Sequence, residues 1–397
     1  MAKAQITNSL CKSCGSVKLT PFYSLESVPV HSVLLMPTEE KAKSYPKGNI
    51  ELVFCEDCGF IFNRCFDSTL HEYSAEYEET QAFSSTFNKF QHELAKNLIK
   101  KYHLHNKTIL EIGCGKGEFL NLLCETGDNR GVGFDPSYIE KRNKSLSKKN
   151  ITFIRDFYSE KYAGHEADFI VCKMTLEHIS DTFDFIQMTR SSIGNRGDTF
   201  LFFQVPNVRY ILQDLAFWDI YYEHCSYFSA GSLSRLFKRG NFEVLDLYTG
   251  YHDQYLMIEA KPKNHTASKK LSGKDDIKEL KKEIDHFVTQ LESKFRFWEK
   301  KLVELKKQNK IVIIWGAGSK AVSFLSTLKI TDEIDCAVDI NPYKHDTYLA
   351  GTGHKIVAPK NLTKLKPDVA IVMNPVYINE IKKDLMKINL HPEILTV

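Results

Sequence analysis

The segment that most constrains this chain runs from residue 108 to residue 135. An apolar run, a glycine turn, a helix start and a second apolar run with a final acid follow one another, as Thr108-Ile109-Leu110-Glu111-Ile112-Gly113-Cys114-Gly115 and then Gly131-Val132-Gly133-Phe134-Asp135. This order predicts a nucleotide-binding β-α-β unit. Glycines let the backbone approach a ligand closely, and an acid about 20 positions later can accept hydrogen bonds from ribose hydroxyls.

The spacing of this motif favours one class of cofactor. Glu111 precedes the glycines, and Gly-Cys-Gly-Lys-Gly differs from the dinucleotide pattern Gly-x-Gly-x-x-Gly. Both features favour S-adenosylmethionine over a nicotinamide. The alternative is a turn that needs glycine for steric reasons alone and binds no ligand. We therefore expect Glu111, Gly113, Gly115 and Asp135 to contact S-adenosylmethionine.

Apolar runs alternate with helical stretches through the middle of the chain. A helix is predicted over residues 83–102, and further strands at 131–134, 151–154, 167–172 and 199–204. This alternation predicts a doubly wound parallel sheet. Asp156 and Lys173 follow the third and fourth strands, at the carboxyl ends where such sheets bind ligands, so we assign both to the cofactor site. For Glu177 and His178, which come next, burial or helix capping is the expected role.

Length and composition describe a globular protein of several domains. A chain of 397 residues is too long for one ordinary core, so two or three domains are expected. The net charge of +3 gives no strong electrostatic attraction for nucleic acid. The first ten residues have no signal-peptide pattern and no run approaches 18 apolar residues, so we expect a cytoplasmic protein without a membrane partner.

Four of the ten cysteines form two pairs near the start of the chain. Cys11 with Cys14 and Cys55 with Cys58 are each a Cys-x-x-Cys followed by glycine, a turn that can aim two thiolates at one metal ion. Two such knuckles predict a closed, structural site for Zn²⁺. A redox Cys-x-x-Cys is the alternative, but it is expected near a β-α-β pattern and would not occur twice.

The last third of the chain predicts a linker, a long helix and a second α/β unit. Residues 261–310 are rich in charged residues, and Leu280, Ile284, Phe287, Leu291 and Phe295 recur at helical spacing. An apolar run then leads into Gly316-Ala317-Gly318-Ser319-Lys320. At a helix start, Gly316, Gly318, Ser319 and Lys320 can bind phosphate through backbone amides and the lysine charge. A purely structural strand-to-helix turn is the alternative.

A segment past the fifth core strand, residues 219–229, combines acids, phenols and an imidazole. His224 titrates near neutrality and can remove a proton, and Glu223 can orient or hold a neighbouring group. Tyr221 or Tyr222 can donate a hydrogen bond to a developing oxyanion. The alternative is a tyrosine-rich loop that only packs in the core.

These motifs, in this order, resemble a known family. The zinc knuckles, Glu111-Ile112-Gly113-Cys114-Gly115, Tyr221-Tyr222-Glu223-His224 and Trp315-Gly316-Ala317-Gly318-Ser319-Lys320 are similar to those of the three-domain, zinc-containing deoxysugar C-methyltransferases, which act on nucleotide-linked 4-keto sugars. The resemblance implies catalytic roles for His224, Glu223 and Tyr221, and also for Tyr77, which lies ahead of the core domain.

The resemblance also implies an α/β architecture and a reaction. Its domains would be a zinc-binding lobe at 1–75, a methyltransferase domain at 76–260, a linker and long helix at 261–310, and a Rossmann-like sugar-nucleotide domain at 311–397. His224 would remove the C3 proton of a 4-keto sugar, so that a methyl group could be added there. A zinc-bearing RNA methyltransferase and a non-catalytic protein that binds S-adenosylmethionine or a nucleotide sugar stay as alternatives. We expect a monomer or a homodimer.

Overall fold

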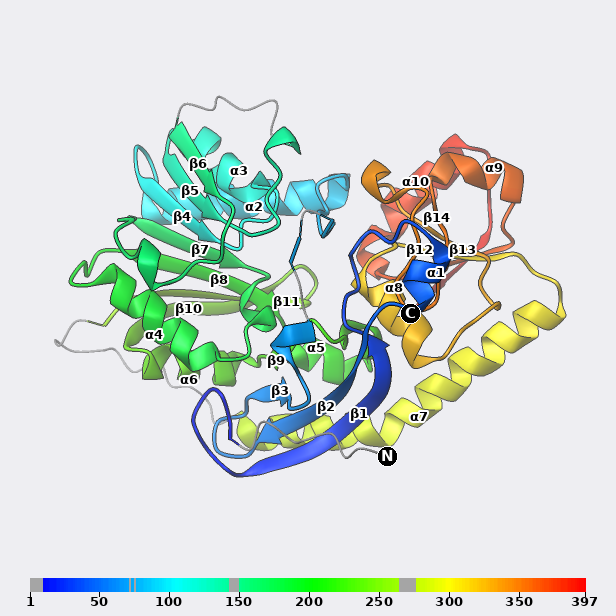
Figure 1. The fold of residues 1–397 in the computed structure, drawn as a ribbon, viewed down its shortest axis with the longest axis horizontal. Helices are drawn as coiled ribbons and strands as arrows, with labels where there is room; N and C mark the ends of the chain where they lie inside the picture. The colour runs from blue at the N-terminus through cyan, green and yellow to red at the C-terminus, as the bar shows by residue number, and fades with distance from the viewer. Residues whose placement is uncertain (1–9, 71–72, 75, 143–149, 264–275) are drawn as a thin grey trace.

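The computed structural model describes residues 10–70, 73–74, 76–142, 150–263 and 276–397 (Figure 1). Two sequence expectations, the absence of a leader at residues 1–9 and most of the linker before the long helix, lie outside the described residues. Within them, the strands form three sheets. No helix in these ranges has the length and apolar character needed to cross a membrane.

A small antiparallel sheet lies at the N-terminal end. Its strands, in the order β1-β2-β3-β9, are β1 (Leu19–Pro29), β2 (Lys47–Cys55), β3 (Ile61–Asn63) and β9 (Ser226–Tyr227), and helix α1 (Glu39–Lys43) lies between β1 and β2. Strand β9 comes from the middle of the chain and pairs with β3 through Ile61 opposite Tyr227. The residues just before β9 are therefore held against the N-terminal sheet, which neither β-propensity nor spacing predicted.

The middle of the chain forms the predicted Rossmann-like sheet. The order is β10-β11-β8-β7-β4-β5-β6, with β4 (Thr108–Ile112), β5 (Arg130–Phe134), β6 (Ile151–Ile154), β7 (Phe169–Lys173), β8 (Phe200–Pro206), β10 (Phe242–Gly250) and β11 (Tyr255–Pro262). Strands β4 to β8 run parallel, and β11 is antiparallel to both neighbours. The strand order reverses between β4 and β7, which is where ligands bind in open α/β sheets.

Helices cover both faces of this sheet. Helices α2 (Ser85–Tyr102) and α3 (Glu118–Gly127) share an apolar cluster with Ile109 and Val171, while α4 (Thr182–Ile193) and α6 (Ala230–Arg239) share another with Leu110 and Cys172. Alternate residues of β4 and β7 thus face opposite layers, as the two-residue period of a strand requires.

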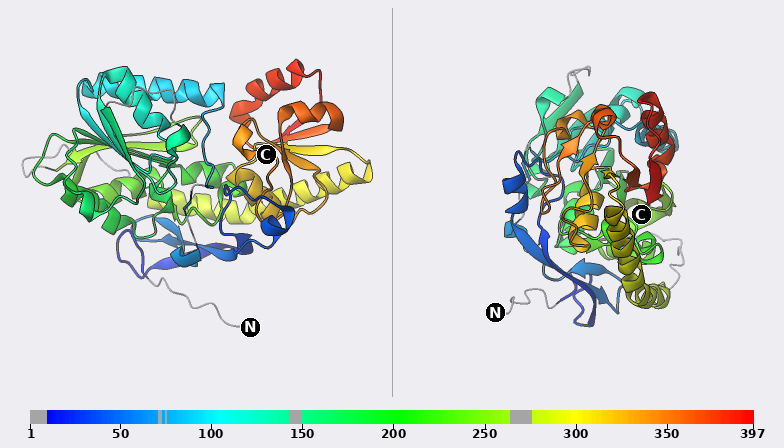
Figure 2. Two further views of the ribbon diagram at one scale, coloured as in Figure 1. Left: turned by 45° about the horizontal axis from the view of Figure 1, so that its top comes forward. Right: turned by 90° about the vertical axis from the view of Figure 1, so that its right-hand side faces the viewer.

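The C-terminal part is a second parallel α/β unit. Its strands run in the order β14-β13-β12-β15-β16, as β12 (Val312–Trp315), β13 (Cys336–Val338), β14 (Ile356–Val357), β15 (Val369–Val372) and β16 (Glu393–Thr396), with helices α8 (Ser319–Thr327), α9 (Leu362–Leu365) and α10 (Ile378–Lys387). Figure 2 shows this unit and the middle sheet side by side above the N-terminal sheet.

One long helix, α7 (Ile277–Lys307), joins the parts, as its spacing predicted. It is not a solvated connector only. Phe287 packs against Tyr23 of β1, Phe295 against Phe217 and Trp298 against Phe324 of α8, with ring centroids 5.9, 4.9 and 5.2 Å apart. The buried stripe of α7 therefore contributes to a core shared by the N-terminal, middle and C-terminal parts.

Candidate active site

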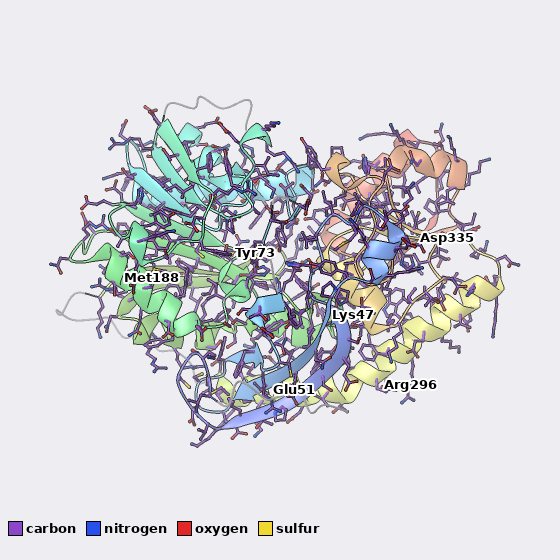
Figure 3. The ribbon with its side chains drawn as sticks, viewed as in Figure 1. Lys47, Glu51, Tyr73, Met188, Arg296 and Asp335 are labelled. Carbon is purple, nitrogen blue, oxygen red and sulfur yellow. The ribbon has the colours of Figure 1, made fainter. Side chains whose placement is uncertain are left out.

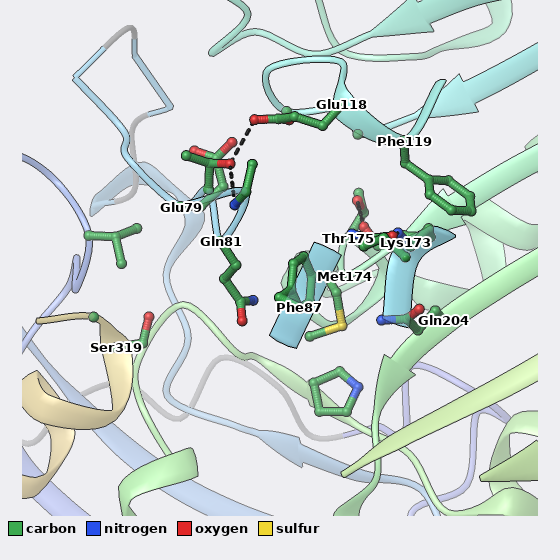
Figure 4. Close-up of a pocket in the computed structure, with 18 of the residues that line it drawn as sticks. Glu79, Gln81, Phe87, Glu118, Phe119, Lys173, Met174, Thr175, Gln204 and Ser319 are labelled. Atoms are coloured by element: carbon green, nitrogen blue, oxygen red, sulfur yellow. Dashed lines mark hydrogen bonds between the residues drawn. The ribbon is translucent and has the colours of Figure 1, made fainter. Parts of the chain in front are cut away.

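A cavity of about 860 Å³ lies where the middle and C-terminal parts face each other. It is lined by the glycine turn after β4, the ends of β5 and β7, the segment before β9 and the glycine turn after β12. Figure 4 shows part of its wall, with Lys173 and Thr175 on one side and Ser319 on another. This volume is near the upper end of the range for ligand pockets. Both glycine turns thus open into one space.

The first glycine turn has the geometry that its sequence predicted. Gly113 and Gly115 have φ angles of 69° and 54°, and the amide of Gly115 donates to Oδ2 of Asp135 at 2.8 Å. A Cβ atom at Gly113 would lie 2.0 Å from Oγ1 of Thr175, so only glycine fits there. The turn therefore places backbone and the Asp135 carboxylate together at the cavity wall.

Charged residues at the strand ends line the same part of the cavity. Burial raises the pKa of Glu111 to about 8 and lowers that of Lys173 to about 8. Asp156 lies at the rim, where its hydrogen bond with Lys161 lowers the pKa of its carboxyl to about 2. All six residues expected at the cofactor site line this cavity, and their contacts with S-adenosylmethionine stay a prediction.

The second glycine turn also lines the cavity, but its lysine is already paired. Gly316 has a φ of 104°, and Ser319 begins helix α8. Lys320 forms an ion pair with Asp219, which lies in the segment before β9. A second lysine that sequence reasoning missed, Lys344 of η7 (Pro342–Lys344), donates to the carbonyl of Ala317 at 3.0 Å and forms an ion pair with Asp339 at 3.3 Å. The charge at this turn is therefore shared between two lysines.

A turn at residues 221–224 builds the centre of the candidate active site. The amide of His224 donates to the carbonyl of Tyr221 at 3.1 Å, so the first and last side chains of the turn meet. The Tyr221 hydroxyl lies 2.8 Å from Nε2 of His224, and both side chains line the cavity. Burial, with the nearby His178 as the next cause, holds the pKa of His224 well below its usual 6.5. The imidazole is neutral at pH 7 and can accept a proton.

Glu223 faces the opposite way and holds the N-terminal part. Its carboxyl lies 2.9 Å from Nδ1 of His31 and accepts the amide of Ser32 at 3.0 Å, as well as the Ser32 hydroxyl. The Ser32 hydroxyl also lies 2.8 Å from that of Ser319 in the second glycine turn. Glu223 is absent from the cavity lining, and its contacts are with His31 and Ser32 of the N-terminal part.

Tyr222, also expected to take part in the chemistry, points away from the cavity. Its ring packs 5.3 Å from that of Phe66, and its hydroxyl accepts the amide of Asp67 at 2.8 Å, outside the cavity lining. The turn directs Tyr221 and Tyr222 to different sides, and the side chain that faces the cavity is Tyr221. Tyr222 instead fills space against Gly48, where a Cβ atom would lie 2.2 Å from its ring.

Tyr77 does reach the cavity, within a buried aromatic group. Its ring centroid lies 5.1 Å from that of Tyr73 and 6.0 Å from that of His31. Burial raises the pKa of Tyr73 and Tyr77 well above 10, so both hydroxyls keep their protons. Tyr73, labelled near the middle of the molecule in Figure 3, also contacts His178.

The four N-terminal cysteines converge. The sulfurs of Cys11 and Cys58 are 3.6 Å apart, those of Cys14 and Cys55 are 3.5 Å apart, and all four lie within 4.8 Å of one another. Tetrahedral Zn²⁺ with bonds of about 2.3 Å holds its sulfurs about 3.8 Å apart, so the donor set fits zinc. None of the four cysteines lines the cavity, and three of them belong to a buried apolar cluster shared with the middle part, which suits a structural site.

Several residues of the site were not predicted from the sequence. His31 and Ser32 gave no local signal, because their partner Glu223 is almost 200 positions away. Glu177 is buried, which was one of its two expected roles, and both Glu177 and His178 also line the cavity. Their position after β7, at the carboxyl end of a parallel strand, was the signal that could have identified them.

Comparisons with known proteins agree with this geometry. Residues 83–247 match the family described as "Methyltransferase domain", and residues 260–391 match the "C-methyltransferase C-terminal domain". The "C-methyltransferase NovU" of Streptomyces niveus is 23% identical over 264 residues, which are 64% of this chain. The match spans 60% of the length of that relative.

Solved structures of methyltransferases are similar over about half of the chain. The match to a riboflavin-derivative dimethyltransferase, RosA of Streptomyces davawensis, covers 44% of this chain and 56% of the RosA chain, at 16% identity and a TM-score of 0.37. Magnesium protoporphyrin IX methyltransferase of Synechocystis PCC 6803 with bound S-adenosylmethionine covers 47% and 86%, at 14% identity and a TM-score of 0.35. The family matches and the NovU match make the chain similar to C-methyltransferases.

Proposed function

We propose that this protein methylates carbon 3 of a nucleotide-linked 4-keto deoxysugar, with S-adenosylmethionine as methyl donor. The observation that carries the proposal is that one cavity joins the Gly113 turn, the Tyr221–His224 pair and the Gly316 turn. The first turn suits the donor and the second suits the phosphates of a sugar nucleotide. The pair between them suits the removal of a proton from carbon.

The residues of the first turn would hold the donor. Asp135 is placed to accept ribose hydroxyls, while Glu111 and Lys173 lie behind the turn. Bound S-adenosylmethionine would supply an electrophilic methyl group. The residues fit this group because the positive φ angles at Gly113 and Gly115 leave the backbone bare toward the cavity.

The residues of the second turn would hold the nucleotide. The amides at the start of α8 and the ammonium groups of Lys320 and Lys344 can meet phosphate oxygens, although Lys320 must then share its charge with Asp219. Ser319 lies next to Ser32, which in turn contacts Glu223. A continuous set of contacting side chains would thus connect the phosphate site with the segment that carries the proposed catalytic base.

His224 would act as the base. A 4-keto group acidifies the proton on the neighbouring carbon, and the buried, neutral imidazole can take that proton. The Tyr221 oxygen would accept the Nε2–H of the neutral ring, which leaves Nδ1 to take the proton. The phenol keeps its own hydrogen, because burial raises its pKa well above 10, and can donate it to the developing negative charge. Carbon 3 then carries the electron pair that forms the new carbon–carbon bond.

The test is incubation with labelled S-adenosylmethionine and a panel of 4-keto-6-deoxy nucleotide sugars, with the product read by mass and by the position of the new bond. His224→Ala should abolish methyl transfer while S-adenosylmethionine still binds, and the exposed His105→Ala is the matched control. Full turnover by His224→Ala would refute the assignment of His224 as the catalytic base. Methylation of RNA instead of every sugar in the panel would refute the substrate class.

A further inference from the structure

Glu177 lies in the cavity wall beside the proposed base. It belongs to η5 (Leu176–His178), the short turn that follows β7, and its side chain is only 1% exposed. Its Oε1 atom lies 4.0 Å from Nε2 of His224. The carboxyl therefore approaches the same part of the cavity as the imidazole, but from the sheet that carries the first glycine turn.

Glu177 keeps both carboxyl oxygens without a hydrogen bond to any residue that the structure describes. Leaving a buried polar group without a partner is costly, and folded proteins keep few such groups without a function. Glu223, equally buried and also close to the base, shows the contrast, because its carboxyl contacts His31 and Ser32. Glu177 therefore places two oxygens without a hydrogen-bond partner in the wall of the cavity that it lines.

Burial keeps this carboxyl neutral. Desolvation raises the pKa of Glu177 to about 8, so the group is mainly protonated at pH 7. Its nearest titratable side chains are His178 and His224, and its charge would also influence the pKa values of Cys172, Tyr221, Cys225, Tyr73 and Tyr255. A carboxylate only accepts hydrogen bonds, whereas a protonated carboxyl donates one.

We propose that Glu177 is a further catalytic residue, whose neutral carboxyl group donates a hydrogen bond to the substrate oxygen that becomes negatively charged while His224 removes the proton from the adjacent carbon. This inference rests on the proposed function. The carbon–hydrogen bond breaks and its proton goes to the imidazole of His224. Its electron pair forms the carbon–carbon double bond of the enolate, and the carbonyl π pair moves to the oxygen. The carboxyl keeps its own proton throughout.

The separation of acid and base suits this reaction. Each group must come within about 3 Å of its target atom, and the two targets, the proton on one carbon and the oxygen on the next, are close neighbours. The carboxyl of Glu177 and the imidazole of His224, whose Oε1 and Nε2 atoms are 4.0 Å apart in one wall, can reach these two target atoms at the same time. A carboxylic acid that an apolar site keeps neutral is a known way to stabilise an oxyanion.

Two substitutions distinguish this role from its alternatives once turnover of a ketosugar is established. Glu177→Gln keeps a neutral donor of the same shape, so kcat should stay within about tenfold of wild type. Glu177→Met keeps the volume without a donor, so kcat should fall about 100-fold or more while KM changes little. Above pH 8 the wild-type rate should fall more steeply than the Glu177→Gln rate, because Glu177 ionises only in the wild type whereas Glu111 and Lys173 titrate in both proteins. The exposed Glu166→Gln is the control.

Three results would overturn the proposal. Glu177→Gln as inactive as Glu177→Met would show that a negative charge is needed there. Glu177→Met as active as wild type would show that the carboxyl has no part in the reaction. A metal ion bound in addition to the one at the cysteine site, and lost in Glu177→Gln, would show that Glu177 is a metal ligand. This outcome is worth testing because donor atoms of Glu177, His178 and His224 lie within 4.8 Å of one another.

An infrared measurement tests the same proposal without any sugar. The difference spectrum between wild type and Glu177→Gln at pH 7 should contain the carbonyl band of a protonated carboxyl, and this band should vanish above about pH 8. A carboxylate band alone at pH 7 would overturn the proposal even if ketosugars are methylated. If the band is present and no ketosugar is methylated, the proposed substrate is wrong, but the conclusion that Glu177 is protonated at pH 7 is confirmed.

Discussion

The Nδ1 atom of His31 lies 2.9 Å from Oε1 of Glu223, although 192 positions separate the two residues in the chain. Both side chains are buried, and Ser32 binds the second oxygen of the same carboxyl through its backbone amide. The segment that follows β1 therefore fixes the residue next to the proposed base. The N-terminal part is a component of the active-site wall as well as a support for the cysteine cluster.

Removing His31 should weaken this attachment. A hydrogen bond to a charged group contributes about 1.5–3 kcal/mol, so His31→Ala should lower the free energy of unfolding by that amount and also reduce kcat. The measurement is a double-mutant cycle with Glu223→Gln, by denaturant unfolding. Because the two side chains touch, their effects should couple by about 0.5–3 kcal/mol. Purely additive effects would mean that the contact contributes nothing.

The cysteine cluster should hold one zinc ion that stabilises the N-terminal sheet. Cys55→Ser should release the metal and lower the thermal midpoint, because a structural zinc site contributes directly to folding. Cys65→Ser is the matched control, since Cys65 lies on the same lobe but outside the cluster. Metal content and thermal unfolding are measured together. A Cys55→Ser protein with full zinc content would contradict the assignment.

Local patterns predicted the parts of the site that depend on a single segment. The glycine turn after β4 needs positive φ angles at fixed positions, so its residue types reveal its shape. The two Cys-x-x-Cys knuckles are likewise short loops that aim their own thiolates. Helix α3 follows β4 and helix α4 follows β7 in the expected order, because hydrophobic periodicity reports burial directly.

Contacts between distant segments could not be predicted in this way. The pairing of β9 with β3, the His31–Glu223 contact and the Lys320–Asp219 ion pair all depend on how three parts pack together. The choice between Tyr221 and Tyr222 depends on the same packing, because a turn sends adjacent side chains to different sides. Residue type alone gives both tyrosines the same chemistry.

The glycine at position 113 should be essential for binding the methyl donor. Gly113→Ala would place a Cβ atom 2.0 Å from Oγ1 of Thr175, at a φ of 69° that strains any other residue. We expect the affinity for S-adenosylmethionine, measured by calorimetry, to fall at least tenfold, which is about 1.4 kcal/mol. Gly164→Ala is the control, because a Cβ atom at that position would have no other atom within 4 Å. Unchanged affinity in Gly113→Ala would place the donor elsewhere.

The buried carboxyl of Glu111 should make stability fall as pH rises. Burial raises its pKa from 4.5 to about 8 in the folded chain. Between these values the unfolded chain releases a proton that the folded chain retains, so rising pH favours unfolding by up to about 1.4 kcal/mol per pH unit. The relative stability that this carboxyl contributes is complete below pH 4.5 and is lost as pH rises through 8.

Glu111→Gln removes this titration while it keeps the shape of the side chain. The free energy of unfolding of wild type, minus that of Glu111→Gln, should therefore decrease steadily from about pH 5 to about pH 8 and then level off, as measured by denaturant unfolding at each pH. Other buried acids, such as Glu177, titrate in both proteins and cancel in the difference. A flat difference across this range would show that Glu111 ionises at its ordinary pKa. The neighbouring ammonium of Lys173, the second-largest influence on that pKa, would then outweigh burial.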